Sequence, residues 1–341
     1  PKPDHHAVER GGCRGFAAAF HTLREAVLPP QHHQSRQTHG DAAAEAPLLA
    51  ACEKLRQIRA MRPAPPRDDQ VLADANGFAI SAIATAAKLM QRSDWLQQAK
   101  QAYGAVLNAN RRDGLLYHSS PSATTNAIST VDDYASLGLA GIALACAEDN
   151  PEMLDFVRTM ADDMLSRFQS SSGIFMQSAD DPVSPFAAGP LVYDQPVPSG
   201  NALAAGFLSQ LGQLLGAPRY RDAALQAITA LGSSLNAEFM GMSALLNAYE
   251  DLIDPIEVHW APADFDAQTI AWAAAPLGAL IVGPRLRSAF MTDICSEMTG
   301  GGILICRDES CGMVERTRSG AISALRNARR IAVQEGGETL S

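Results

Sequence analysis

The sequence lacks the features by which membrane and secreted proteins are usually recognised. No apolar run among its 341 residues reaches the length of about 20 residues that a helix needs to span a bilayer. No charged start followed by an apolar stretch predicts a secretory signal peptide. The first residue is Pro1 rather than Met, which indicates a processed or incomplete N-terminus. We therefore expect a cytoplasmic protein without a membrane span, with an organelle matrix as the alternative.

The chain also lacks an excess of positive charge. It holds 27 Lys and Arg against 37 Asp and Glu, which gives a formal net charge of −10. Such a chain has no overall electrostatic attraction to nucleic acid or to anionic lipid. Hydrophobic residues make up 47% of the sequence, which is typical of a globular protein. We expect no nucleic-acid partner.

The short motifs of common cofactor and metal sites are missing. None of the six cysteines forms a Cys-x-x-Cys pair, and no P-loop, dinucleotide fingerprint or Ser-His-Asp arrangement is present. Cys52 and Cys146 fall on apolar faces of predicted helices, where a buried thiol acts as a small hydrophobe. Cys306 and Cys311 could form a disulfide or bind metal, but the sequence favours unpaired thiols. We expect no metal and no cofactor.

Residues 1–45 differ in composition from the rest. They hold six of the eight histidines, and residues 29–37 show no apolar periodicity. Irregular histidine spacing is a weak signal for metal binding. We interpret 1–45 as a linker or partly disordered arm, with one short helix around 16–27.

From residue 46 to 252 the apolar residues follow the helical period. Stripes predict helices around 48–58, 78–90, 95–107, 134–146, 151–168, 203–215, 220–235 and 239–252. Asp94 and Asn150 are predicted N-caps, and Asp113-Gly114 and Gly216 are predicted stops.

The helices come in pairs, each with an apolar, small-residue first helix and a more amphipathic second one. A helix that is apolar all round is buried, so the first of each pair should be inner and the second outer. Stacked hairpins that bury one continuous core predict a mainly α fold, an α/α toroid or solenoid.

After residue 253 the pattern changes to a small α/β appendage, over 253–341. Residues 256–260 and 302–306 read as strands, and 264–280 and 321–333 as helices.

Polar residues gather just before the predicted inner helices, and parallel inner helices would bring them to one end of the toroid. Paired carboxylates can divide general acid and general base roles, as glycoside chemistry requires. The alternative is ordinary helix capping. His118, which follows the first hairpin, is a further candidate. The candidate cleft comprises Asp68, Asp69, Asn76, Asp132, Asp133, Tyr134, Asp194, Ser199 and Asn201.

Several short motifs over residues 46–330 occur in the same order as in a known protein family. The order resembles that of thioredoxin-domain-containing proteins of the spermatogenesis-associated protein 20 type, which implies an (α/α)6 toroid similar to sugar epimerases and six-hairpin glycosidases. The motifs are Arg62, 68–72 (DDQVL), Asn76-Gly77, 132–135 (DDYA), 198–201 (PSGN) and 305–311.

The chain departs from that family in ways that bear on activity. It has no thioredoxin-like domain and no early toroid motifs, Gln70 stands in place of Lys, and Ala75 stands in place of Trp. The resemblance therefore implies an incomplete α/α toroid of helical hairpins. Its missing hairpins would remove part of the cleft wall, and a missing aromatic ring would weaken stacking on a sugar. We therefore hypothesise a non-catalytic interaction subunit whose toroid is completed by a protein partner. The alternative hypothesis is a carbohydrate-active or carbohydrate-binding protein with a carboxylate cleft.

Overall fold

The computed structural model describes residues 42–63, 69–120, 128–179, 189–237, 239–291, 294, 296–308 and 310–335. Contacts divide the chain into two units between Asp69 and Gln70. Helix α2 (Ala42–Ala60), which the sequence placed at the start of the hairpin domain, belongs to the first unit. Cys52 on α2 is exposed, which corrects the expectation of a buried thiol, because the contacts of α2 fall within its own unit. The predicted helix at 16–27 lies outside the described residues.

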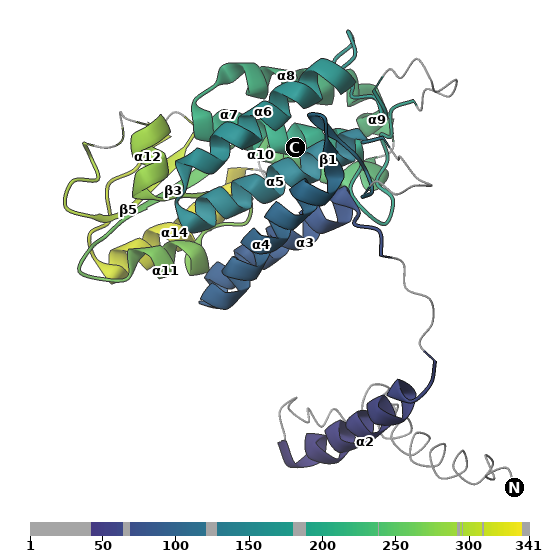
Figure 1. The fold of residues 1–341 in the computed structure, drawn as a ribbon. Helices are drawn as coiled ribbons and strands as arrows, with labels where there is room; N and C mark the ends of the chain where they lie inside the picture. The colour runs from purple at the N-terminus through teal and green to yellow at the C-terminus, as the bar shows by residue number, and fades with distance from the viewer. Residues whose placement is uncertain are drawn as a thin grey trace, which may run out of the picture. The chain divides into compact units, whose positions relative to one another are not determined.

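The N-terminal part of the second unit contains three helical hairpins followed by α10 (Figure 1). The first helix of each hairpin contacts the first helix of the next, and α10 contacts α7, so four helices form an inner layer. The hairpins are α3 (Ala73–Leu89) with α4 (Ser93–Asn110), α5 (Val131–Glu148) with α6 (Pro151–Phe168), and α7 (Gly200–Leu215) with α8 (Pro218–Ala230). The short α9 (Gly232–Ala237) and η1 (Phe239–Met242) precede α10 (Ser243–Ile253).

Burial separates the inner helices from the outer ones. Helix α5 is buried along nearly its whole length, from Val131 to Ala147. Helix α6 buries one stripe, which runs from Leu154 to Phe168, and leaves its other face to solvent. The predicted inner and outer roles are confirmed, and so is the incomplete α/α toroid.

The ends of the helices follow from local chemistry. Asn150 caps α6 by accepting from the Glu152 backbone N–H at 3.2 Å, and Gly216 ends α7 in the left-handed region with φ of 58°. Asp94 does not cap α4, because the helix already begins at Ser93 and the carboxylate pairs with Arg92 at 2.6 Å. Between α4 and α5, β1 (Arg111–Arg112) and β2 (Leu115–Leu116) form a tight hairpin.

The C-terminal part forms a four-stranded sheet in the order β4-β3-β5-β6, with β4 parallel to β3 and the other pairs antiparallel. The predicted strands and terminal helix are present, whereas the predicted helix over 264–280 stops at Ala274, before Pro276 and Gly278. The elements are β3 (Ile256–Ala261), α11 (Ala267–Ala274), β4 (Leu280–Val282), α12 (Pro284–Phe290), β5 (Gly302–Arg307), β6 (Ser310–Cys311) and α14 (Arg318–Glu335).

Cys306 and Cys311 form a disulfide, which corrects the expectation of unpaired thiols. The two residues lie opposite each other where β5 pairs with β6. The two cysteines meet because of the register in which β5 pairs with β6, and the five-residue separation in the sequence does not reveal that register. Within the described part of the chain, no helix has the length and apolar character to cross a membrane.

Candidate functional site

The N-terminal ends of three inner helices meet in the second unit. The Asp74 backbone N–H in the first turn of α3 donates to Asp133 Oδ1 on α5 at 3.2 Å. Gly200, the first residue of α7, packs so closely on α5 that a Cβ there would lie 3.0 Å from Asp132 Oδ2. Parallel inner helices therefore bring their free ends together, as the sequence analysis expected.

Asp133 is the buried centre of this junction. Its side chain is fully buried, and Oδ2 accepts from the Thr130 backbone N–H at 2.7 Å and from Thr130 Oγ1 at 3.0 Å. Its other oxygen accepts from Asp74 and lies 2.9 Å from His118 Nδ1. Asp133 therefore starts α5, ties α3 to it and orients His118.

His118 lies in the segment between β2 and α5, and two carboxylates face its ring. Its Nδ1 is 2.9 Å from Asp133 Oδ1 and 4.0 Å from Asp74 Oδ1. The hydrogen bond to Asp133, followed by the negative charges of Asp133, Asp74 and Asp132, raises the pKa of His118 against the opposing effect of burial. The imidazole therefore stays protonated to a higher pH than an ordinary histidine.

Asp132 is a half-buried carboxyl next to Asp133. Burial raises its pKa, and the charges of Asp133 and Asp74 act in the same direction. Gln177 Nε2 donates to Asp132 Oδ2 at 2.6 Å, which partly opposes the rise. Asp132 thus keeps its proton to a higher pH than an ordinary aspartate, the property that a general acid needs.

A groove of about 390 Å³ lies along α3 and α5. It begins at Gly77 and Ser136, one helical turn beyond Asp74 and Asp132, and extends to Leu89. Gly77 is required there, because a Cβ would lie 2.7 Å from the Ser136 backbone. Hydroxyls of Ser81, Thr85 and Ser136 alternate with apolar side chains along the walls.

Asp74, His118 and Asp133 each offer one metal-ligand atom, and these atoms lie within 4.8 Å of one another. Both oxygens of Asp133 already accept hydrogen bonds from protein donors. A cation would have to displace those donors, so the arrangement suits proton sharing better than metal binding.

Three other candidate residues hold the structure around α7. Asp194 accepts from the backbone N–H groups of Ser199 and Ala244, at 3.0 and 2.9 Å, and so joins the start of α7 to α10. Ser199 caps α7 through the Ala202 N–H at 3.3 Å. Asn201 is buried and bonds both backbone groups of Phe175 at 2.9 Å. The helix-capping alternative describes the contacts of Ser199 and Asp194, whereas Asn201 anchors the segment that follows α6.

The remaining candidates lie apart from the cluster or outside the described residues. Tyr134 is buried, and its hydroxyl accepts from Arg167 at 3.4 Å. Asn76 Nδ2 donates to the Leu72 carbonyl at 2.7 Å, so its amide is used within α3. Asp68 lies outside the described residues, and Asp69 ends the first unit.

Sequence reasoning left two members of the cluster out of the candidate cleft. Asp74 carries a signal, since it stands in the first turn of an inner helix just as Asp132 and Asp133 do. Gln177 carries none, because it reaches Asp132 from an extended segment after the second hairpin.

No protein-family model and no curated protein matches the chain. Among solved structures, it is similar to a GH76 alpha-mannanase from Bacteroides thetaiotaomicron, with 12% identity and a TM-score of 0.45 over 62% of this chain and 59% of that one. It is also similar to the GH76A alpha-1,6-mannanase from Salegentibacter sp. HEL1_6, with 11% identity and a TM-score of 0.40 over 56% of this chain and 55% of that one.

A third similar structure is the unsaturated glucuronyl hydrolase from Bacillus sp. GL1, with 18% identity and a TM-score of 0.39 over 56% of each chain. The chain spans less than two thirds of the length of each of these structures. Its fold is therefore assigned from its own hairpins, and the resemblance to the thioredoxin-domain-containing family stays a prediction.

Proposed function

We propose that the protein binds a carbohydrate in the groove between α3 and α5 and acts on it by proton transfer. The observation that carries this proposal is the meeting of Asp74, Asp132 and Asp133 with His118, about one helical turn before Gly77 and Ser136, which line the near end of the groove. Carboxyl groups in different environments are the usual means of supplying an acid and a base in glycoside chemistry.

The environments of the two outer carboxyls differ in the required way. Asp132 is the proton donor, because burial and neighbouring charge raise its pKa. Asp74 is the proton acceptor, because its side chain is 26% exposed and its Oδ1 lies 4.0 Å from His118 Nδ1. Asp133 is a positioning residue, since both of its oxygens accept hydrogen bonds from the protein.

The groove suits a sugar ring, which has a hydroxylated rim and an apolar C–H face. Ser81, Thr85 and Ser136 provide hydroxyls, and Phe78 provides an aromatic surface for the apolar face. Its volume of about 390 Å³ falls within the usual range for small-molecule sites.

The test uses the full chain with a panel of oligosaccharides, and it measures both binding and release of reducing ends or epimers. Asp132→Asn keeps the shape of the side chain but removes the proton donor, so binding should persist while turnover falls by at least about a hundredfold. Asp155→Asn, at an exposed position on α6, is the matched control and should change neither quantity. Absence of any oligosaccharide binding by the intact chain would contradict the proposal.

A second candidate function is a non-catalytic interaction subunit, and one feature of α3 favours it. Ile83 and Leu89 on this helix and Met90 directly after it are 39%, 47% and 66% exposed. Exposed apolar side chains at the edge of a hairpin stack are suited to a protein partner that completes the toroid. Native mass measurement of the protein purified from its source tests this function. A stoichiometric complex without glycan binding would support it, and a monomer that binds glycan would contradict it.

A further inference from the structure

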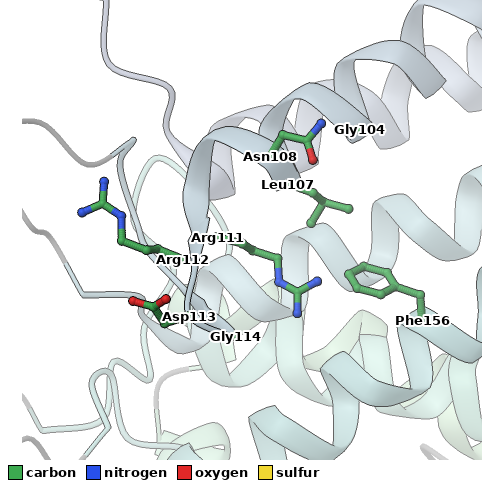
Figure 2. Close-up of a pocket in the computed structure, with 8 residues that line it drawn as sticks. All are labelled: Gly104, Leu107, Asn108, Arg111, Arg112, Asp113, Gly114 and Phe156. Carbon is green, nitrogen blue, oxygen red and sulfur yellow. The ribbon is translucent and has the colours of Figure 1, made fainter.

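A second pocket, of about 370 Å³, lies between the C-terminal half of α4, the β1–β2 hairpin and α6 (Figure 2). It shares no lining residue with the groove between α3 and α5. The polar side chains that line it are those of Asn108, Arg111, Arg112 and Asp113.

Arg111 is held in the pocket by an aromatic ring. Its guanidinium carbon lies 5.1 Å from the centroid of the Phe156 ring on α6, and Figure 2 shows the side chain extending from β1 toward that ring. A guanidinium attracted to an aromatic ring spends no N–H group on a hydrogen bond to it, so its donors stay available. Among the described residues, no carboxylate forms an ion pair with Arg111 and no acceptor bonds its guanidinium.

The surroundings of Arg111 add positive charge and open space. Arg112 extends from the opposite side of β1, and Asp113 is the one carboxylate among the residues that line the pocket (Figure 2). On α4, a Cβ built on Gly104 would meet no atom within 4 Å, so the helix surface there is free. An excess of positive charge in a pocket is notable in a chain whose net charge is −10.

We propose that this pocket binds a small organic anion, a carboxylate or phosphate on a compact body, with Arg111 as the anchoring residue. The planar guanidinium matches two oxygens of a carboxylate or phosphate with two parallel N–H donors. Because Phe156 already holds the side chain in place, little conformational freedom is lost on binding. The pocket volume admits a ligand of one or two rings. This inference is independent of the proposed carbohydrate site.

The test follows the arginine Nε–H signals of the ¹⁵N-labelled full chain by NMR. Benzoate, its neutral analogue benzamide, and inorganic phosphate are the probes. We expect the Arg111 signal to shift on saturable binding of benzoate or phosphate and to stay in place with benzamide. A stronger response to benzoate would identify a carboxylate ligand, and a stronger response to phosphate a phosphorylated one. No saturable shift with either anion, or an equal shift with benzamide, would overturn the proposal.

Three variants locate the effect. Arg111→Lys keeps the charge but loses the planar fork, and should weaken anion binding by at least about tenfold, measured at the backbone amide of Gly114 because the Arg111 Nε–H is lost. Gly104→Leu fills the pocket from the α4 side and should abolish binding while the protein melts no lower than the wild type, because glycine is a poor helix former. Arg158→Lys, whose arginine is paired with Asp155 on α6, is the control and should bind as the wild type does. Unchanged binding in both Arg111→Lys and Gly104→Leu would also overturn the proposal.

Discussion

At the scale of single residues, His118 makes the stability of the fold depend on pH. Its pKa is raised chiefly by the hydrogen bond to Asp133, so the imidazolium is favoured in the folded state. A raised pKa contributes stability that is complete below the unfolded pKa, about 6.5, and that is lost as pH rises through the folded pKa. We expect the wild type to exceed His118→Gln in stability by the largest margin below about pH 6.5 and by less above it. Urea unfolding at a series of pH values measures the margin, and the other histidines cancel because both proteins contain them. A margin that does not change with pH would contradict this role for His118.

Substitution of Asp133 should destabilise the fold, whereas substitution of its neighbour Asp132 on α5 should leave stability nearly unchanged. Asp133 is fully buried and receives Thr130 and Asp74 donors, so in Asp133→Asn an amide group would face N–H groups that need an acceptor. We expect that change to cost about 2 kcal/mol of unfolding free energy. Asp132→Asn should cost less than about 0.5 kcal/mol of unfolding free energy. The amide oxygen of the new side chain can still accept from Gln177, and the substitution leaves no charge at position 132. Urea titrations at neutral pH compare the two, and equal losses would show that Asp132 is as structural as Asp133.

The sequence predicted the residue types of the cluster better than their roles. Asp132 and Asp133 stand side by side, and nothing in their spacing shows that one accepts hydrogen bonds from Thr130 while the other lies against Gly200 and Gln177. Asp194 also precedes a predicted inner helix, but both of its carboxylate oxygens accept hydrogen bonds from the backbone at the starts of α7 and α10. The distinction depends on which donors the fold delivers to each carboxylate, and those donors come from distant segments such as the one that holds Gln177.

At the scale of elements, glycines decide how closely helices approach each other. Gly138 in α5 lies against the ring of Phe207 on α7, whereas Gly104 in α4 has open space around it. Both positions are interior to helices, so alanine adds about 1 kcal/mol of helix propensity at each. We expect Gly104→Ala to raise stability by about 1 kcal/mol, and Gly138→Ala to lower it by about 1–3 kcal/mol because the added methyl overpacks the core. Thermal and urea unfolding of the pair measures both changes. Stabilisation by both substitutions would mean that α5 and α7 are packed less closely than described.

Elements with many apolar repeats were predictable, and short ones were not. Helices α5, α6 and α7 each carry several turns of periodic apolar residues, which is enough to show both the helix and its buried face. Strand β4 has three residues and is buried throughout, so it shows no alternation. The disulfide between Cys306 and Cys311 likewise follows from the register of β5 and β6, which only the folded sheet provides.

At the scale of the molecule, one edge of the C-terminal region joins the core of the hairpins, while the rest of the sheet buries two smaller apolar clusters of its own. Leu280, Val282 and Leu286, from β4 and α12, belong to the same buried apolar cluster as the inner helices. The Asp149 carboxylate at the end of α5 also caps α12, by accepting from the backbone N–H groups of Arg285 and Leu286 at 2.9 Å each. The change of sequence pattern near residue 253 therefore marks a change of topology, while the packing continues across it.

That shared core predicts which truncations the protein tolerates. Because contacts divide between Asp69 and Gln70, a chain starting at Gln70 should keep the melting temperature of the intact protein to within a few degrees. A chain that also stops at Ile253 would expose the surface that β4 and α12 cover and would lose the pairing of Asp149 with α12. We expect this shorter chain to lose cooperative unfolding and near-UV circular dichroism while it retains helical far-UV signal, since secondary structure outlasts specific packing. If it melted cooperatively at the temperature of the longer chain, the hairpins alone would be the folding unit and the sheet would be an independent addition.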